Sequence, residues 1–246
     1  MTRPTVKDVA EVAGVSVATV SRALSGARAV TAEHKQSVLE AAAQLGYKPH
    51  TIAQALRSSR TGAIGMVVPR IDNPFFPQLV SEAERRLQER GFALLLCSSD
   101  DDPEIEAQRI AVLTERQVDG LLVSPSSQTA SVAALQIAAQ SIPTVQFDQF
   151  APGAPTAFVG VDDAAGIRDV VALLTRTGRT RLAFVGAGDD NWSGMRRRRG
   201  FETWAGAEDR FAMERMELGS FTREFGREAA LRLFARHPEI DAVVCA

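Results

Sequence analysis

The chain contains 246 residues with a formal net charge of −2, and 45% of its side chains are apolar and 24% charged. This composition is typical of a globular protein and excludes disordered, collagen-like and disulfide-scaffold classes. No apolar run reaches the roughly 20 residues that a membrane helix needs, and the first residues lack the apolar segment of a secretory signal. The two cysteines, Cys97 and Cys245, lie in apolar runs. We therefore expect reduced thiols and a cytoplasmic protein.

Basic residues are concentrated at the start of the chain. Residues 1–60 hold eight lysines and arginines against four acidic residues, whereas the remainder holds twenty against twenty-six. A basic head on an acidic body is typical of a protein whose head binds a polyanion. Chance scatter of charges explains the asymmetry equally well, so the motifs must decide between the two.

Three short helices are predicted in the head, over residues 6–13, 17–24 and 32–45. Gly14 permits a turn between the first two helices, and Ser16 stands at the N-cap of the second. The other predicted caps are Thr5, which is followed three residues later by Asp8, and Thr31. Apolar residues at helical spacing predict a shared core of Val9, Ala10, Val15, Val20, Leu24, Val38, Leu39 and Leu45.

The first two helices have the spacing of a helix-turn-helix motif. In such a motif the start of the second helix faces base edges in the major groove, while the first helix lies against the backbone. Val17 and Ala18 then offer apolar contacts, for example to a thymine methyl group, and Arg22 offers a bidentate contact to guanine. The alternative is a three-helix bundle without a ligand. Phosphates would be bound by the hydroxyls of Thr5, Ser16, Thr19, Ser21 and Thr31.

After Gly62 short apolar runs alternate with helical segments. This alternation predicts right-handed βαβ units, with parallel strands covered by helices on both faces. Neighbouring runs near residues 144 and 157 indicate a crossing between two lobes, which we place at residues 62–160 and 161–246. Strands are expected to begin near Ala63, Phe92, Gly120, Thr144, Ala157, Arg181, Phe211 and Asp241, and helices over residues 76–90, 103–116, 130–140, 164–176, 194–204 and 223–236.

Several segments together carry a family resemblance. The head contains Val-Lys-Asp-Val-Ala at 6–10, Ala-Gly-Val-Ser at 13–16, Thr-Val-Ser-Arg at 19–22 and Leu-Gly-Tyr-Lys-Pro at 45–49, and the body contains Asn-Pro-Phe-Phe at 73–76 and Val-Asp-Gly-Leu-Leu at 118–122. In these segments the sequence resembles the LacI/GalR (lactose-repressor-like) family of bacterial transcriptional regulators. The likeness extends through the whole chain.

The resemblance implies a fold and a function. The implied fold is a helix-turn-helix head (residues 1–49), a hinge helix and linker (50–61), and a two-lobed α/β sensor like a periplasmic binding protein, with doubly wound parallel sheets (62–160 and 161–246). The implied function is that of a repressor that binds a palindromic operator as a homodimer and responds to a monosaccharide or a derivative in the cleft between the lobes. The resemblance implies no catalytic activity, cofactor, metal or membrane association.

The second lobe is shorter than the resemblance implies. Its three predicted strands are fewer than the five or six common in doubly wound lobes, and at about 30 residues for each βαβ step roughly 60–100 residues are missing. The family also places an asparagine–aspartate pair directly after the position of Ala246. We therefore expect the chain to be incomplete at its C-terminus.

A short helical segment over residues 51–57 resembles the family's hinge helix. Seven residues are too few for a stable isolated helix, so ordering is expected only when two copies pair on DNA. Leu56 would then act as an apolar wedge in the minor groove, with Ala53 and Arg57 beside it. In the alternative, the segment is a flexible linker and Leu56 packs on the body. We also assign Tyr47 and His50 to the DNA-binding surface.

Six residues are candidates for effector binding. Asn73, Phe75 and Phe76 follow the first strand of the body, where ligands of α/β proteins bind, although one phenylalanine is expected to start the next helix. Asp148 ends a strand where the family places a carboxylate, but it is also suited to capping. The remaining candidates are Trp192, which suits the core equally well, and Arg197, which matches the family's effector-binding arginine within the run at 196–199.

Two rival functions have less support. A sugar-binding transport component is opposed by the basic head and by the missing secretory signal. A truncated regulator without an effector response is the other alternative. An enzyme is not indicated, because the three histidines are far apart and there is no nucleophile motif. The acidic residues 100–102 resemble a metal cluster but suit a solvated loop better.

Overall fold

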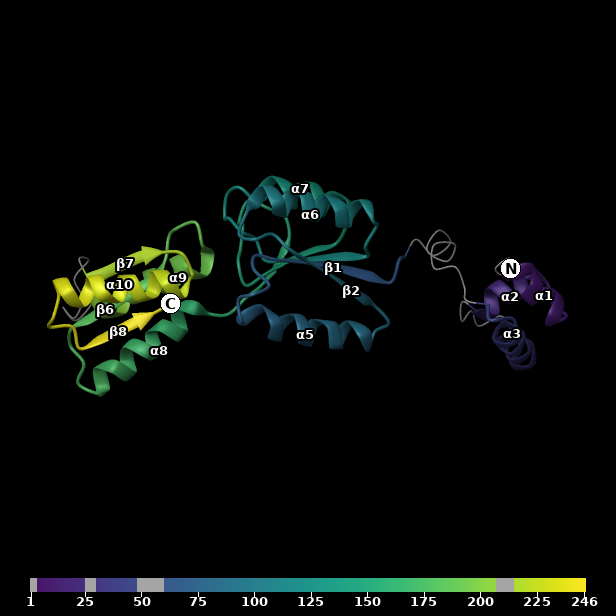
Figure 1. The fold of residues 1–246 in the computed structure, drawn as a ribbon, viewed down its shortest axis with the longest axis horizontal. Helices are drawn as coiled ribbons and strands as arrows, with labels where there is room; N and C mark the ends of the chain where they lie inside the picture. Colours follow the sequence, from purple (N-terminus) through teal and green to yellow (C-terminus); the bar gives the residue numbers. More distant parts are fainter. Residues whose placement is uncertain (1–3, 25–29, 48–59, 207–214) are drawn as a thin grey trace. The chain divides into compact units, whose positions relative to one another are not determined.

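A computed structural model describes residues 4–24, 30–47, 60–206 and 215–246 (Figure 1). The chain divides into two compact units, residues 1–62 and 63–246. The predicted hinge helix and the predicted start of a strand at Phe211 lie outside the described residues. Within the described part of the chain, no helix is both long and apolar enough to cross a membrane.

The first unit is a three-helix head built from α1 (Val6–Val12), α2 (Val17–Leu24) and α3 (Ala32–Leu45). Gly14 turns the chain between α1 and α2 with a φ of +64°, and Gly46 ends α3 with a φ of +63°. Both angles lie in the left-handed region that glycine adopts without a steric penalty. The head core consists of Val9, Ala10, Val20, Ala23, Val38, Ala41 and Ala42.

The second unit begins with a five-stranded parallel sheet in the order β2-β1-β3-β4-β5. Helices α6 and α7 cover one face and α5 the other, as Figure 1 shows. Val67 of β1 packs in the core under α6 and α7, whereas Met66 and Val68 pack against Phe76 of α5. The elements are β1 (Ala63–Val68), α5 (Phe75–Gln88), β2 (Ala93–Ser98), α6 (Pro103–Glu115), β3 (Gly120–Val123), α7 (Val132–Ser141), β4 (Thr144–Phe147) and β5 (Ala157–Val159).

The unit continues into a three-stranded parallel sheet in the order β7-β6-β8. Strand β6 is buried along its whole length. Its Phe184 packs on Phe201 of α9, with ring centroids 5.1 Å apart, while Ala183 and Val185 face the core under α10. The elements are α8 (Asp163–Arg176), β6 (Leu182–Ala187), α9 (Trp192–Gly206), β7 (Met216–Gly219), α10 (Arg223–Arg236) and β8 (Ala242–Cys245).

The seventh predicted strand is described from Met216, where β7 begins. Met216 pairs with Phe184 of β6 and packs against the core around that ring. The predicted start at Phe211 lies outside the described residues.

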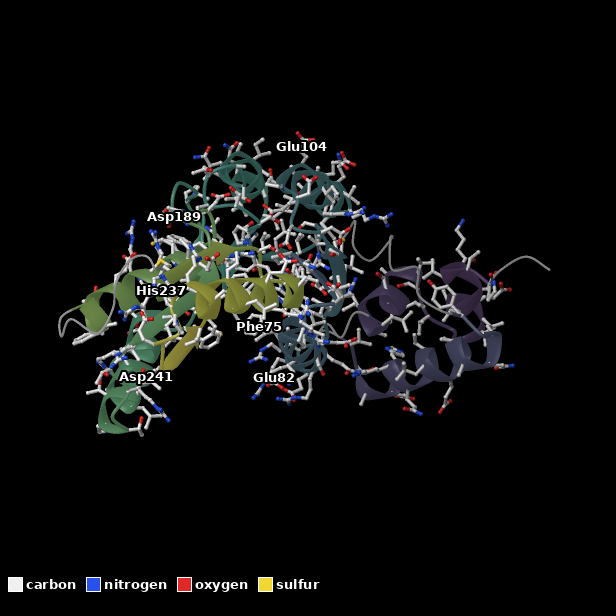
Figure 2. The ribbon with its side chains drawn as sticks, turned by 60° about the vertical axis from the view of Figure 1, so that its left-hand side comes forward. Phe75, Glu82, Glu104, Asp189, His237 and Asp241 are labelled. Carbon is white, nitrogen blue, oxygen red and sulfur yellow. The ribbon has the colours of Figure 1, made fainter. Side chains whose placement is uncertain are left out.

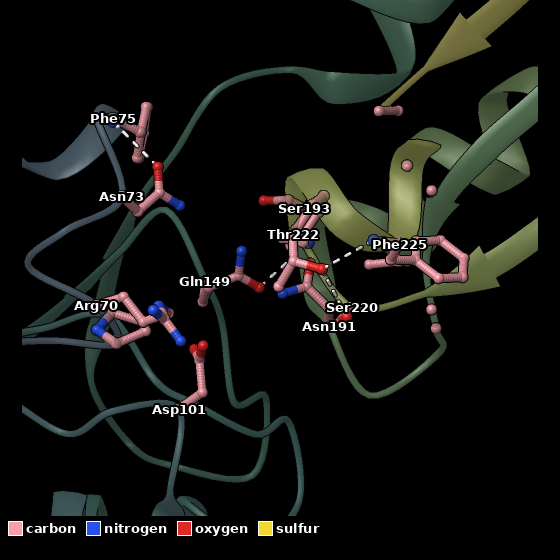
Figure 3. A pocket seen from close by; sticks show the side chains of 18 of the residues that line it. Arg70, Asn73, Phe75, Asp101, Gln149, Asn191, Ser193, Ser220, Thr222 and Phe225 are labelled. Carbon is pink, nitrogen blue, oxygen red and sulfur yellow. Dashed lines mark hydrogen bonds between the residues drawn. The ribbon is translucent and has the colours of Figure 1, made fainter. Parts of the chain in front are cut away.

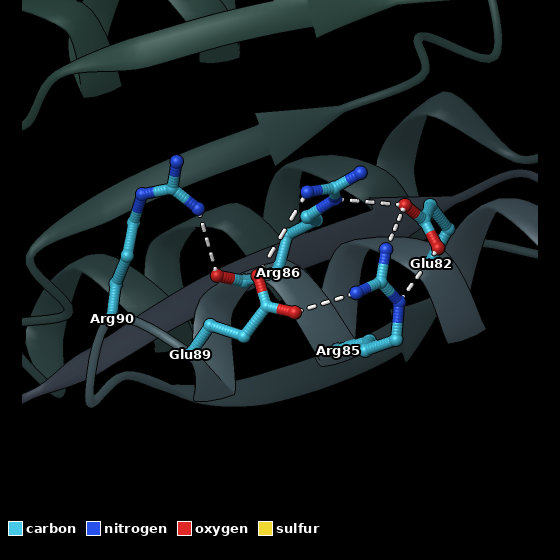
Figure 4. A network of polar contacts seen from close by, with 5 residues as sticks. All are labelled: Glu82, Arg85, Arg86, Glu89 and Arg90. Carbon is cyan, nitrogen blue, oxygen red and sulfur yellow. Dashed lines mark hydrogen bonds and ion pairs between the residues drawn. The ribbon is translucent and has the colours of Figure 1, made fainter.

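The outward side of α5 carries a ladder of arginines and glutamates (Figure 4). Glu82 accepts two hydrogen bonds from Arg85, at 3.0 and 2.6 Å, and one from Arg86 at 2.9 Å. The bonds from Arg85 are the largest cause that lowers the pKa of Glu82, to about 2. Figure 2 labels Phe75 at the start of this helix and Glu82 further along it. Exposed ion pairs of this kind add little stability.

Glu106 of α6 is a fully buried carboxylate. Its Oε2 accepts a hydrogen bond of 2.6 Å from the backbone N–H of Ser126, while its Oε1 has no partner. Burial is the main cause that raises its pKa above the ordinary value of 4.5. Burial of a charged carboxylate lowers the stability of the fold even where the carboxylate accepts a hydrogen bond.

Glu106→Gln is expected to raise the free energy of unfolding of the body at pH 7 by about 1 kcal/mol, because it removes a charge that burial disfavours and keeps an oxygen that can accept from Ser126. The raised pKa means that the native state holds the proton more tightly than the unfolded chain, so the contribution of Glu106 to stability falls as the pH rises above 4.5. The gain is therefore smallest at pH 4. Urea unfolding followed by tryptophan fluorescence measures it, because Trp192 and Trp204 both lie in the body.

The matched control is Glu115→Gln, which removes the same charge at the exposed C-terminal end of α6. We expect no pH-dependent gain from it. A Glu106→Gln gain that is equal at pH 4 and pH 7, or a loss at pH 7, would contradict the assignment of the cost to the buried charge.

Candidate functional site

The outward side of α2 presents the residues expected to contact bases. Val20 and Ala23 point into the head core, so the helical period turns positions 17, 18 and 22 outward. Val17 is 42% exposed although it is apolar. Ala18 and Arg22 are exposed as well, and Ser21 is partly buried. A short helix with a small apolar and basic outer surface fits the major groove of DNA.

Hydroxyl groups close the helix starts of the head. Ser16 Oγ accepts a hydrogen bond of 3.1 Å from the backbone N–H of Thr19, and the two hydroxyls lie 2.9 Å apart. Thr5 and Asp8 form a capping box at α1, and Thr31 caps α3 through the N–H of His34 at 3.3 Å. All three predicted caps are present, and their exposed positions leave the hydroxyls accessible to phosphates.

Tyr47 lies partly buried against the head core. The ring therefore has a packing role whether or not its hydroxyl contacts DNA. The other predicted DNA-binding residues lie outside the described residues: His50, Ala53, Leu56 and Arg57.

The positive excess of the head comes mostly from its flanking segments. The described residues 4–47 contain three basic residues, Lys7, Arg22 and Lys35, against four acidic ones. The other basic residues among the first sixty are Arg3, Arg28, Lys48, Arg57 and Arg60. The first four of these lie outside the described residues.

A cavity of about 1080 Å³ lies in the body, at the carboxyl ends of the strands of both sheets (Figure 3). Residues after β1, β2, β3 and β4 line one side, and residues at the ends of β6, β7 and β8 line the other. Open α/β sheets bind ligands at this edge because loops and helix starts converge there.

Five of the six predicted effector residues line this cavity: Asn73, Phe75, Phe76, Asp148 and Arg197. The two phenylalanines differ in role, because Phe76 is 4% exposed in the core and Phe75 is 46% exposed. Their rings meet edge to face at 5.2 Å. Phe75 is thus the ring that a ligand can contact, while Phe76 holds the start of α5 on the sheet.

Trp192 is absent from the cavity lining in the described part of the chain. It packs edge to face on Phe150, with centroids 5.2 Å apart, and on Phe158 at 6.4 Å. Ser193, the next residue of α9, lines the cavity instead. Of the two roles considered for Trp192, packing in the core describes this position better than lining the cleft.

Two carboxylates reach the cavity from left-handed backbone. Asp148 has a φ of +61° and Asp101 a φ of +59°, a conformation that is uncommon outside glycine and that aspartate tolerates best among charged residues. Burial is the largest cause that raises the pKa of each carboxyl above its ordinary value. A nearby Arg197 opposes this effect at Asp148, and Arg70 opposes it at Asp101. Unusual backbone that places the exposed Asp101 and the partly buried Asp148 on one cavity indicates a binding role.

The arginine run at 196–199 divides among several partners. Arg197 donates a 2.7 Å hydrogen bond to Asp163, whose side chain is buried. Arg196 lies over the Trp192 ring at 5.6 Å, and Arg198 pairs with Asp189 at 2.6 Å. Of the four arginines, Arg197 alone lines the cavity.

The start of α9 also bridges the two sheets. Ser193 Oγ donates to the carbonyl of Asp148 at 3.1 Å, and the Ser193 N–H donates to Gln149 Oε1 at 3.4 Å. Gln128 Nε2 donates to the carbonyl of Asp189 at 2.6 Å. Loops that line the cavity thus hold the five-stranded and three-stranded sheets together.

Sequence reasoning missed several cavity residues. Asp101 was assigned to a solvated loop, yet it lines the cavity while its neighbour Asp102 caps α6. The available signal for Asp101, as for Arg70 and Gln149, was a position in the loop that follows a strand. The further missed residues are Arg70, Gln149, Asn191, Ser193, Ser220, Thr222 and Phe225.

Comparison with known proteins identifies the family. The family described as "Periplasmic binding proteins and sugar binding domain of LacI family" matches residues 61–246. The family described as "Bacterial regulatory proteins, lacI family" matches residues 5–50. The chain belongs to the LacI family. The matches confirm the predicted fold class, a helix-turn-helix head with a sensor like a periplasmic binding protein, and they identify a DNA-binding regulator of transcription.

Individual relatives agree with this membership. The LacI-family chain is 33% identical over 247 residues to the HTH-type transcriptional regulator DegA of Bacillus subtilis, covering 96% of this chain and 71% of DegA. A transcriptional regulator CelR–cellobiose complex is 29% identical, with a TM-score of 0.66 over 99% of this chain and 74% of that one. The lac repressor dimer bound to operator and the anti-inducer ONPF has a TM-score of 0.86 over 100% of this chain and 74% of that one, and at 22% identity it shows the likeness of the fold.

Arg197→Met is expected to lower the free energy of unfolding of this body by about 2 kcal/mol, because it leaves the Asp163 carboxylate buried without its partner. The double variant Arg197→Met/Asp163→Asn should recover most of the loss. Urea unfolding by tryptophan fluorescence gives the coupling free energy of the cycle. Arg199→Met, on the exposed side of α9, is the control and should change stability by less than about 0.5 kcal/mol. Additive losses in the double variant would show that the two side chains do not stabilise the body as a pair.

Proposed function

We propose that this LacI-family chain is a repressor that binds a palindromic operator as a homodimer and releases it in response to a small sugar-like effector. The observation that carries the proposal is the outer side of α2, where Val17, Ala18 and Arg22 are exposed beyond a buried core. Such a helix enters the major groove, with its first turn directed at base edges. Two copies related by a two-fold axis read two inverted half-sites.

Arg22 is the proposed base-reading cation. Its guanidinium suits the N7 and O6 atoms of guanine, whereas Val17 and Ala18 suit a thymine methyl group. The caps Thr5, Ser16 and Thr31 supply hydroxyls for phosphates. Residues 50–59, including Leu56, remain the proposed minor-groove element, which would pair with its counterpart in the dimer.

The cavity is the proposed effector site. Asp148, Asp101 and Asn73 offer polar groups of the kind that hydrogen-bond sugar hydroxyls, and Phe75 offers an exposed ring for the apolar side of a sugar. The CelR relative was solved as a cellobiose complex, which supports a sugar-like effector here. We propose that effector binding shifts the two sheets relative to each other and so weakens operator binding.

We further propose a cytoplasmic protein without catalytic activity, because the relatives are transcriptional regulators. A transport component is disfavoured by the same relatives and by the match of residues 5–50 to the regulatory head.

The operator proposal is tested by selecting binding sites from a random DNA pool with the purified chain. We expect an inverted repeat. Arg22→Ala should lower affinity for the selected site at least tenfold and relax the preference at one base pair in each half-site, because a bidentate contact is lost. Fluorescence anisotropy measures both. The matched control is Lys35→Ala, which removes the same charge from α3 and should leave the selected sequence unchanged. An unaltered selection with Arg22→Ala would overturn the assigned role.

The effector proposal is tested on the selected operator with a panel of common monosaccharides and disaccharides. At least one sugar should weaken operator binding, and Asp148→Ala should abolish that response while preserving operator affinity without sugar, because Asp148 lies in the body and not in the head. Asp169→Ala, on the exposed side of α8, is the control and should respond like the native chain. A native chain whose operator affinity no sugar alters would contradict a sugar-like effector.

A further inference from the structure

The charges around the cavity are dominated by carboxylates. Three arginines line it against five acidic side chains. The buried Asp163 lies behind this lining, paired with Arg197. The acidic residues in the lining are Asp72, Asp101, Asp148, Asp190 and Glu224, and the arginines are Arg70, Arg197 and Arg223.

Two of the three arginines already have a carboxylate partner. Arg70 donates two hydrogen bonds to Asp72, at 2.9 and 2.6 Å, and Arg197 donates to Asp163 at 2.7 Å. The third, Arg223, is exposed at the start of α10 and is followed directly by Glu224. An anionic ligand must therefore compete with existing ion pairs for Arg70 and Arg197.

Polar side chains occupy part of each of three helix starts at the cavity. A free helix start supplies backbone N–H groups that bind phosphate. Here Asn73 Oδ1 accepts from the N–H of Phe75 at 3.1 Å, and Asn191 Oδ1 accepts from that of Gly194 at 2.8 Å. At α10, Thr222 Oγ1 accepts from the N–H of Phe225 at 3.2 Å. One first-turn N–H of α5, of α9 and of α10 is therefore already bound to a side chain of this chain (Figure 3).

The groups that remain suit hydroxyls. The amides of Asn73 and Asn191 use their oxygens in capping, which leaves their NH₂ groups as donors. The Asp101 carboxylate lies near Arg70 in the cavity lining (Figure 3), and Asp148 accepts a hydrogen bond of 3.3 Å from Gln149. A hydroxyl group both donates and accepts hydrogen bonds. Carboxylate acceptors and amide donors in the same cavity therefore complement the hydroxyl groups of a ligand.

We propose that this cleft selects an uncharged polyhydroxylated effector and rejects the phosphate esters and carboxylic acids of the same compound. The inference rests on the proposed effector function and adds the charge class of the ligand. Asp101 and Asp148 are the residues that discriminate, because each accepts from a hydroxyl and repels a nearby anion. A ligand anion would also lose its hydration while two of the three arginines in the lining are already paired with carboxylates.

The test is isothermal titration calorimetry of the chain at pH 8, where phosphate esters are dianions and the carboxylates are ionised. The probes are matched sets: glucose, galactose, mannose, fructose and ribose, each with its phosphate ester, and the hexoses also with their uronic acids where these exist. We expect a neutral sugar to bind and its anionic derivatives to bind at least tenfold more weakly. Raising the salt concentration should narrow that ratio, because ions screen the repulsion.

Conservative variants test whether Asp101 and Asp148 cause the preference for a neutral ligand. Asp101→Asn and Asp148→Asn keep the side-chain shape and remove one charge each. Each variant should bind the neutral sugar more weakly, and the ratio of its affinities for the neutral sugar and the phosphate ester should be smaller. Asp169→Asn removes the same charge on α8 away from the cavity and should leave the ratio unchanged. Thermal unfolding of each variant confirms that it is folded.

Two results overturn the inference in distinguishable ways. A phosphate ester or uronic acid that binds as tightly as its neutral parent, or more tightly, contradicts the charge selection and leaves the effector function standing. A complete panel that gives no binding contradicts the sugar-like effector function, and the charge selection falls with it.

Discussion

The burial of both faces of each parallel sheet is the constraint on which the body depends. Side chains alternate along β1 between the core under α6 and α7 and the core under α5, and β6 alternates in the same way between the cores under α8–α9 and α10. No face of either strand is left for polar groups. Chemistry is confined to the strand ends, and because the strands are parallel all their carboxyl ends reach one edge of each sheet. The cavity lies at that edge in both sheets.

The three-helix head has only a small buried core. Seven small or medium-sized side chains form its buried core, so the helices must be stabilised at their ends as well. Capping by Thr5, Ser16 and Thr31 satisfies backbone donors, and glycine at the left-handed positions 14 and 46 provides sharp turns at no steric cost. The stabilising interactions described here thus occupy the inner side and the ends of α2. Two apolar residues, Val17 and Ala18, on the outer side of an exposed helix are unusual.

Sequence patterns recovered the element order and most element starts, because the buried strands and the capped helices each have a strong local signal. They failed where tertiary contacts decide. The sequence left Trp192 equally suited to the cleft and to the core, and in the structure its ring packs on Phe150 and Phe158. Asp101 gave no distinct signal within an acidic loop, and its role depends on left-handed backbone and on the neighbouring Arg70.

The loop after β4 ties ligand contact to the arrangement of the two sheets. The Asp148 carboxylate lines the cavity, while its backbone carbonyl accepts a hydrogen bond from Ser193 of α9. Gln149 has the same double position, because its amide oxygen accepts from the Ser193 N–H and its amide nitrogen donates to Asp148. Three groups from two sheets therefore share a few hydrogen bonds, and a ligand that takes one of them changes the partners of the rest. A difference in these bonds between bound and free states is the differential interaction that any effector-driven shift requires.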